Sequence, residues 1–173
     1  MEGGRFSYNY AGDINNNGVS FNDLLYVPTD GEIDQMAFDA DIDTEATQRD
    51  AFKSYIAQDK YLSTVWGQYA ERNGALTSWY SNWDMRILQD LGVGGSKKIQ
   101  ISLDILNVGN LLNSNWGVRQ FAINNQPISV DVDGGGNPTY GFEPQLVNTF
   151  ADSAALLSRW RMQVGLRFIF KSV

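Results

Sequence analysis

The chain ends in Arg159-Trp-Arg-Met-Gln-Val-Gly-Leu-Arg-Phe-Ile-Phe170, the stretch that most sharply predicts the fold. Its even-numbered positions are all apolar, whereas the odd-numbered positions are polar or small apart from Ile169. A period of two identifies a β-strand with two chemically different faces. The apolar row runs from Trp160 to Phe170 and has an aromatic residue at each end. Because a tilted membrane strand needs about 9–11 residues, the pattern predicts a transmembrane β-strand.

Two earlier segments alternate in the same way. Residues 79–89 and residues 99–107 each carry a mainly apolar row opposite a mainly polar one. Only a Gly-rich link over residues 91–98 separates them, which predicts an antiparallel hairpin. Residues 5–10, with aromatic side chains at every second position, are a shorter fourth candidate. The side chains expected to face lipid are Trp83, Met85, Ile87, Ile99, Ile101, Leu103, Ile105, Trp160, Met162, Val164, Leu166, Phe168 and Phe170.

The connections between these strands differ in length in the manner of a membrane barrel. Long insertions over residues 11–75 and 108–157 alternate with the short link at residues 91–98. Short turns on one side and long loops on the other are typical of outer-membrane barrels. We therefore expect a mainly β chain that contributes about four antiparallel transmembrane strands to a partial β-barrel. The short link would face the periplasm, and the two long insertions would be extracellular loops.

Each insertion also has predicted structure of its own. Residues 47–64 have the spacing of a helix, and Thr47 followed by Asp50 resembles a capping box. Residues 116–124 and 130–143 resemble strands, and a Gly-rich tight turn interrupts the second of them. The sequence thus predicts a short helix in the first loop and a strand-and-turn arrangement in the second.

The composition excludes several kinds of site. The chain has no Cys and no His, which rules out thiol nucleophiles, zinc centres of the usual kind and Ser-His-Asp triads. A metal site would have to use oxygen ligands, as calcium and magnesium sites do. We expect the protein not to be an enzyme.

Charge and hydropathy narrow the class of protein further. The net charge of −7 is uneven, because residues 11–59 hold eleven acidic and two basic residues, a balance of −9, which leaves +2 for the rest. The chain has no basic stripe of the kind that binds nucleic acid. No run reaches the ~18–20 apolar residues of a membrane helix, and the first residues do not have the pattern of a secretory signal. The lack of a membrane helix does not argue against membrane strands, whose average hydropathy resembles that of a soluble protein, whereas an outer-membrane protein would need a secretory signal.

One loop has the pattern of a calcium site. Side-chain oxygens recur at alternate positions before Gly18, as in an EF-hand loop that wraps a hard cation. The candidate ligands are Asp13, Asn15, Asn17, Val19 and Asp23. The twelfth position is Leu24 instead of a bidentate Glu, and two of the first three ligands are neutral. The alternative is an Asn/Asp/Gly-rich turn whose side chains bond to their own backbone. Calcium is the one cofactor that the sequence suggests.

Three further groups have a structural and a functional interpretation. The acidic run over residues 30–45 is typical of a solvated surface, although it could gather cations. Charged residues on the polar rows favour a structural ladder inside the barrel over paired catalytic carboxylates. They are Asp84, Arg86, Asp104, Arg161 and Arg167. Aromatic residues suit interface belts or loop packing, and the alternative is stacking on a sugar or another ligand. They are Trp79, Trp83, Trp116, Trp160, Tyr61 and Tyr69.

With these residues in view, the chain resembles the C-terminal part of a TonB-dependent outer-membrane receptor of the Bacteroidetes-type, carboxypeptidase-regulatory-like group. The resemblance rests on several segments that together span nearly the whole chain. The segments taken together are more specific to this family than any one of them alone. Its segments are Asp13-Ile-Asn-Asn-Asn-Gly18 with Asn22-Asp-Leu-Leu-Tyr-Val-Pro28, Tyr69-Ala-Glu-Arg-Asn-Gly74, Asp104-Ile-Leu-Asn-Val-Gly-Asn-Leu-Leu-Asn113 with Trp116-Gly117, and Gly165-Leu-Arg-Phe-Ile-Phe170.

The resemblance implies active uptake of a nutrient ligand across the outer membrane of a Gram-negative bacterium. Receptors of this family are plugged barrels of about 22 strands, powered through the TonB complex. Phe170 would be the signal read by the barrel-assembly machinery. The implied partners are outer-membrane lipid, the remainder of the barrel and its plug, the TonB complex and that machinery. Residues 1–173 contain no plug domain and continue past Phe170, so we expect a fragment whose open edges need the rest of the barrel.

A secreted or surface β-rich module that binds a ligand or calcium is the alternative class, and an enzyme such as a glycosidase is a third. A soluble sandwich should show about seven short strands at intervals of 8–12 residues. This sequence instead has three long alternating segments separated by two long insertions. That spacing favours the barrel.

Overall fold

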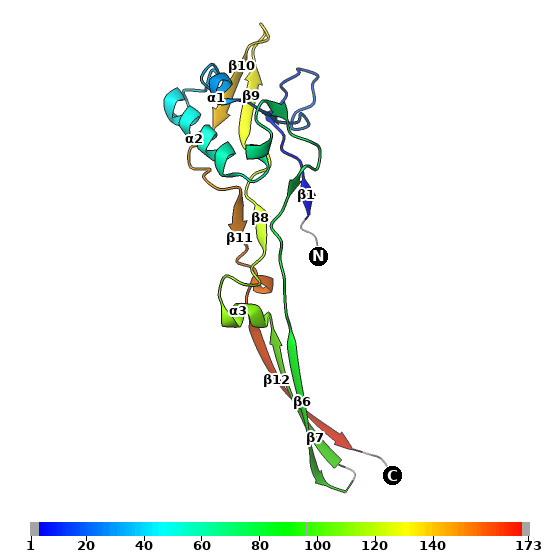
Figure 1. The fold of residues 1–173 in the computed structure, drawn as a ribbon. Coiled ribbons are helices and arrows are strands. Elements are labelled where there is room, and N and C mark those ends of the chain that lie inside the picture. The colour runs from blue at the N-terminus through cyan, green and yellow to red at the C-terminus, as the bar shows by residue number, and fades with distance from the viewer. Residues whose placement is uncertain (1–3, 96, 171–173) are drawn as a thin grey trace. The chain divides into compact units, whose positions relative to one another are not determined.

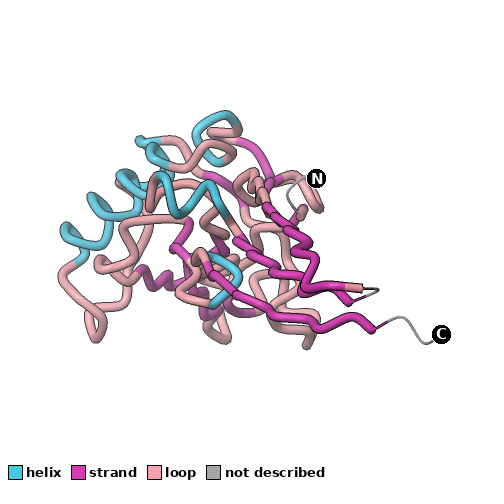
Figure 2. The backbone as a smooth tube through the Cα atoms, turned by 90° about the horizontal axis from the view of Figure 1, so that it is seen from below, coloured by secondary structure: helices cyan, strands magenta, loops and turns pink. Residues whose placement is uncertain are grey.

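Three strands of ten residues each form the longest sheet of the computed structural model, which describes residues 4–95 and 97–170. They are β6 (Met85–Gly94), β7 (Lys97–Leu106) and β12 (Arg161–Phe170). Their order is β12-β7-β6, both pairings are antiparallel, and Figures 1 and 2 show the strands running side by side. The final strand therefore pairs with β7 rather than with the residues before it in the sequence.

The predicted hairpin is confirmed, but its predicted limits are wrong. Residues 79–84 have no regular structure, and the first strand begins only at Met85. At the other end the strands continue through most of the predicted link, to Gly94 and from Lys97. A bulge between Gly92 and Gly94 and a left-handed Gly95 (φ +61°) turn the chain at this point. Ser96 lies outside the described residues.

The residues divide into two units, each built from two separate stretches of sequence. We call residues 79–120 and 152–170 the sheet unit, which contains β6, β7, β12, the short helix α3 (Val108–Leu112) and the 3-10 helix η2 (Leu156–Ser158). We call residues 4–78 and 121–151 the core unit. The described chain is 36% strand and 17% helix, so the mainly β class is confirmed, whereas no described sheet closes into a barrel.

The core unit combines short strands with two α-helices and one 3-10 helix. Its helices are α1 (Asp30–Ile33), α2 (Glu45–Gln58) and the 3-10 helix η1 (Leu62–Thr64). Its strands are β1 (Arg5–Phe6), β2 (Ala11–Gly12), β3 (Tyr26–Val27), β4 (Gln68–Tyr69), β5 (Ala75–Leu76), β9 (Ile128–Val132) and β10 (Pro138–Phe142). The pairs are β1 with β5 and β3 with β4, and β9 lies between β10 and β2. The pairing of β2 with β9 is parallel, whereas the other three are antiparallel. The remaining short strands, β8 (Gln120–Ala122) and β11 (Phe150–Asp152), pair with each other.

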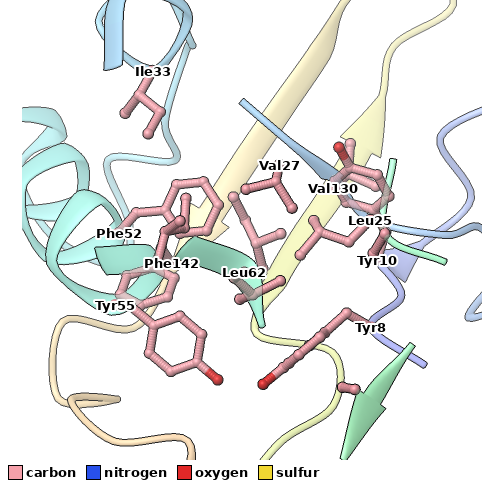
Figure 3. Close-up of a cluster of buried hydrophobic side chains, with 14 of the residues drawn as sticks. Tyr8, Tyr10, Leu25, Val27, Ile33, Phe52, Tyr55, Leu62, Val130 and Phe142 are labelled. Atoms are coloured by element: carbon pink, nitrogen blue, oxygen red, sulfur yellow. The ribbon is translucent and has the colours of Figure 1, made fainter. Parts of the chain in front are cut away.

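A hydrophobic core joins the two long insertions within this unit. Phe52 and Tyr55 of α2 pack on Phe142 of β10, with ring centroids 5.2 and 5.6 Å apart. Leu25 and Val27 from the first insertion are fully buried in the same cluster (Figure 3). Each stretch alone would leave these apolar side chains in water. Residues predicted as two separate loops therefore share one core.

The prediction of a fourth strand in the long sheet over residues 5–10 is wrong. Only Arg5 and Phe6 are paired as a strand, and their partner is β5. The aromatic residues of this segment do share a face, because Tyr8 and Tyr10 are both buried in the core. Alternation identified a two-faced segment but could not identify what covers its apolar face.

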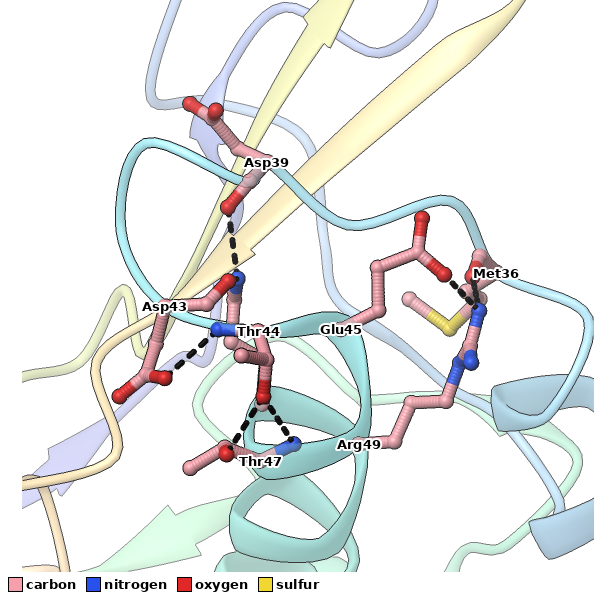
Figure 4. A network of polar contacts seen from close by, with 8 residues as sticks. Met36, Asp39, Asp43, Thr44, Glu45, Thr47 and Arg49 are labelled. Carbon is pink, nitrogen blue, oxygen red and sulfur yellow. Dashed lines mark hydrogen bonds and ion pairs between the residues drawn. The ribbon is translucent and has the colours of Figure 1, made fainter.

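The predicted helix over residues 47–64 is shorter and starts earlier. Helix α2 spans Glu45–Gln58, and its N-cap is Thr44, whose hydroxyl accepts a hydrogen bond from the Thr47 amide (3.3 Å; Figure 4). The predicted cap at Thr47 is therefore wrong by one turn. A full capping box forms instead at α1, where Thr29 and Glu32 bond to each other's backbone amides or side chains. In the second insertion, β9 and β10 form the predicted strands joined by a Gly-rich turn.

Candidate functional site

The apolar rows of the three long strands meet on one face of the sheet. Cross-strand register places Leu103 between Ile87 and Val164, and the neighbouring rows are aligned in the same way. The face is open: the exposed fraction is 71% for Val164 and 76% for Leu166. Two further sets of cross-strand neighbours lie on this face. One set is Met85, Ile105 and Met162, and the other is Leu91, Ile99 and Phe168. An exposed apolar face of this extent indicates a surface that contacts a partner or a membrane.

The remaining predicted lipid-facing residues are Ile105, Trp83, Trp160, Ile101 and Phe170, and they differ in position and exposure. Ile105 is only 7% exposed, because the methionines Met85 and Met162 flank it on both neighbouring strands. Trp83 and Trp160 lie just before β6 and β12 instead of within them, and both are exposed. Ile101 and Phe170 lie in the strands and are exposed, and their contact with lipid stays a prediction.

The opposite face of the sheet carries the predicted polar ladder. Arg86 and Asp104 form an ion pair across β6 and β7. Two cross-strand pairs further along the same face, the Gln100 amide donates to the Asp90 carboxylate (2.9 Å), and Lys98 lies 3.8 Å from the same carboxylate. On β12, Arg161 and Arg167 occupy the same face opposite Leu106 and Gln100, and Asp84 instead accepts a bond from the Asn107 amide (2.9 Å). These contacts give the charged residues a structural role.

The side chains of Asn107 and Asn110 form hydrogen bonds that hold one end of the long sheet. The sequence alone predicts no role for these two residues. Asn107, nearly fully buried and left-handed (φ 55°), donates its side-chain amide to the Gly117 carbonyl (2.9 Å). A Cβ on Gly117 would collide with the Asn107 side chain, so only glycine fits there. Asn110 donates to the Ser114 and Trp116 carbonyls and accepts from the Trp160 amide (3.2 Å). The two asparagines thus tie the end of β7 to the start of β12.

The predicted calcium loop is closed by its own hydrogen bonds. The Asp13 carboxylate accepts from the Asn17 amide (3.1 Å) and the Gly18 amide (2.6 Å). The side-chain oxygen of Asn17 accepts from the Val19 amide (2.9 Å), and Asp23 accepts from both the Ile14 amide and the Asn15 side chain. No group of three or more acidic residues is placed to hold a metal within residues 4–95 and 97–170. The contacts support the self-bonded turn.

Replacing Asp13 with alanine tests this loop. Because two backbone amides lose a charged acceptor, we expect the free energy of unfolding of the core unit to fall by about 1–2 kcal/mol without any metal present. Millimolar calcium should leave the melting temperature of the unchanged protein where it is. Thermal melts with and without calcium, on both proteins, measure the two effects. A calcium-dependent rise in melting temperature that disappears in the variant would instead establish the metal site.

The other candidate residues have local structural partners. In the acidic run, Asp34 pairs with Lys53 (2.7 Å) and Glu45 with Arg49 (2.6 Å), both involving α2 (Figure 4 shows the second pair). Among the aromatics, Tyr61 stacks on Tyr8 at 6.3 Å and accepts the Glu71 amide through its hydroxyl (2.6 Å). Tyr69, Trp79 and Trp116 are more than half exposed, as belt or ligand-contacting residues would be.

The outer strands of the long sheet each have one unpaired edge. Within the described residues, β6 and β12 pair only with β7, on opposite sides. Backbone groups on these free edges need hydrogen-bond partners, and a further strand on each side would supply them. None of the described helices has the length and apolar character needed to cross a membrane.

Comparison with models of known protein families gave no match. Comparisons with curated proteins and with solved structures likewise gave no significant match. The function is therefore inferred from the residues and geometry of the chain.

Proposed function

We propose that this chain is part of an outer-membrane receptor of the TonB-dependent type, which takes up a nutrient ligand across the outer membrane of a Gram-negative bacterium. In this proposal β6, β7 and β12 cross the membrane, and the two long insertions belong to its extracellular loops. One observation carries it: three ten-residue strands align their apolar rows on one exposed face, and all their charged residues except Lys97, at the end of β7, lie on the other. Ten tilted residues match the thickness of a bilayer.

The physical chemistry of the sheet supports lipid as the partner of this face. Burying a large apolar side chain is worth roughly 1.5–3 kcal/mol, so a row such as Val164, Leu166 and Phe168 is costly to leave in water. Hydrocarbon removes that cost without requiring a complementary surface. The free edges of β6 and β12 would pair with neighbouring strands of the same barrel, because membrane strands must satisfy every backbone group. The polar face, with Arg86 paired to Asp104, would line the lumen.

The role of the chain within such a receptor would be structural and not catalytic. Its partners would be outer-membrane lipid, the other strands of the barrel and the plug. The TonB complex and the assembly machinery follow from the resemblance, with Phe170 as the assembly signal. The hydrogen bonds of Asn107 and Asn110 would hold the ends of two neighbouring membrane strands in register.

A second candidate is a surface or secreted β-rich binding module. The observation that favours it is the core unit, which has its own buried cluster and does not depend on the apolar face of the sheet. In that case the apolar sheet face would meet another protein surface instead of lipid.

Site-specific labelling distinguishes the two candidates. The chain has no native Cys, so Val164→Cys and Leu166→Cys each provide one labelling site on the apolar face, and Gln163→Cys and Arg167→Cys are matched controls on the other. We expect fluorophores at 164 and 166, in protein reconstituted into vesicles, to be quenched several-fold more by nitroxide-bearing lipid than those at 163 and 167. Aqueous iodide should show the opposite order. Equal iodide quenching at all four positions would rule out the membrane strand.

A further inference from the structure

A small cavity in the core unit has a lining that no part of the receptor proposal uses. Its volume is about 130 Å³, and its lining includes the three tyrosines Tyr10, Tyr26 and Tyr140. Of its lining residues, Tyr10 and Phe52 are buried, whereas Glu32 is exposed. At about 30 Å³ per water molecule the space would hold roughly four waters. It therefore suits a compact group of a few heavy atoms.

The carboxylate of Glu32 is charged but already occupied as a hydrogen-bond acceptor. It accepts from the Thr29 amide (2.7 Å), the Thr29 hydroxyl (2.8 Å) and the Tyr26 hydroxyl (2.9 Å). The two bonds from Thr29 and then the bond from Tyr26 hold the pKa of Glu32 below its usual value, so the group is ionised at neutral pH. It can attract a cation through its charge, while offering few free lone pairs to an N–H donor.

The charges around the cavity are negative. No basic residue lines it. Arg49, which donates to the carbonyl of the lining residue Met36, is paired with Glu45, and Lys53 is paired with Asp34. Helix α1 adds the carboxylate of Asp30 in the same turn as Glu32. A cation approaching the cavity would meet an attractive field.

We propose that this cavity binds a quaternary ammonium group. Aromatic rings present electron-rich faces that attract such cations, and rings and carboxylates together are the usual lining of their sites. Tyr10 and Tyr140 have centroids 6.3 Å apart and are tilted by 40°, and Met36 and Phe52 provide apolar contact for methyl groups. A primary ammonium, in contrast, brings three donors that need acceptors. The inference concerns the core unit alone and holds for either candidate function.

Choline and its neutral carbon analogue 3,3-dimethylbutan-1-ol form a matched pair of probes. We expect the full chain, in a maltoside detergent that carries no ammonium group, to bind choline roughly tenfold more tightly than the alcohol, because only choline has the charge. Saturation-transfer NMR titrations measure both affinities. Equal affinity for the two probes, or no binding of choline, overturns the proposal.

Two variants and one control locate the site. Glu32→Gln removes the charge but keeps a residue that suits the third position of a capping box, and Tyr140→Leu removes one ring. Each should weaken choline binding by roughly three- to tenfold. Glu71→Gln changes the same charge away from the lining residues and should have no effect. Unchanged affinity in both cavity variants, or equal weakening in the Glu71 variant, contradicts the assignment. Circular dichroism confirms that each variant is folded.

Discussion

Phe142→Ala is expected to lower the free energy of unfolding of the core unit by about 3–5 kcal/mol. The ring is fully buried and packs on both Phe52 and Tyr55 of α2, so its removal leaves a cavity between β10 and the helix. At about 1.4 kcal/mol per factor of ten, amide hydrogen exchange in α2 should accelerate by roughly a hundred- to several thousand-fold. Exchange measured by mass spectrometry on peptides from α2 reports this unit separately from the sheet.

Phe121→Ala is the matched control. This residue belongs to the same unit, and its side chain is 52% exposed. Its loss should change the stability by no more than about 0.5 kcal/mol. Similar acceleration in both variants would show that the cluster around Phe142 does not hold the unit together.

The second large effect is expected at Asp59, a buried carboxylate that joins three parts of the core unit. One of its oxygens accepts the Tyr61 and Leu62 amides (2.8 Å each), and the other accepts the hydroxyls of Tyr8 (2.7 Å) and Thr149. Asp59→Ala leaves these four donors without their acceptor. Since a buried unsatisfied donor costs about 1–3 kcal/mol and some will find new partners, we expect a loss of about 3–4 kcal/mol. Urea unfolding followed by tyrosine circular dichroism measures it.

A control and a double-variant cycle separate this network from a general charge effect. Asp50→Ala removes the same charge from an exposed position on α2 and should change stability by no more than about 0.5 kcal/mol. Tyr8→Phe removes one donor, so its cost should be smaller in the Asp59→Ala background than alone. Strict additivity of the two substitutions would refute the proposed network.

The sequence was sufficient to predict the sheet, because alternation is a local signal. Alternation in residues 79–89, 99–107 and 159–170 predicted which side chains of each strand share a face. In the sheet, the strand register places the apolar residues of the three strands opposite one another. The strand limits were wrong at both ends of the hairpin. At the start of the hairpin, Trp79 continues the alternation in the sequence, but its backbone has no strand partner. At the turn, the glycines of the predicted link are compatible with a strand that continues through a bulge between Gly92 and Gly94.

The core unit could not be predicted, because its contacts join distant residues. Gln48 shows the difficulty: its amide nitrogen donates to the Asp39 and Asp43 carbonyls (2.6 Å each), and its oxygen accepts the Phe142 amide 94 residues away. A buried glutamine on a helix gives no local sign of such a partner. The tyrosine-lined cavity was missed for the same reason, since Tyr10, Glu32 and Tyr140 come together only through the fold. In the sequence Glu32 belonged to an acidic run without a specific role.

The division of each unit between two stretches of sequence has a consequence for the time at which the protein can fold. The core unit needs Phe142, and the sheet needs the residues from Arg161 onward, which are synthesised after the hairpin. Contacts between residues so far apart in sequence form slowly, because the long intervening segments must first be closed into loops. A chain that grows from its N-terminus therefore cannot complete the core unit before Phe142 is made, or the sheet before the residues from Arg161 onward are made. In the proposed receptor, such late folding would keep the chain extended during export across an inner membrane.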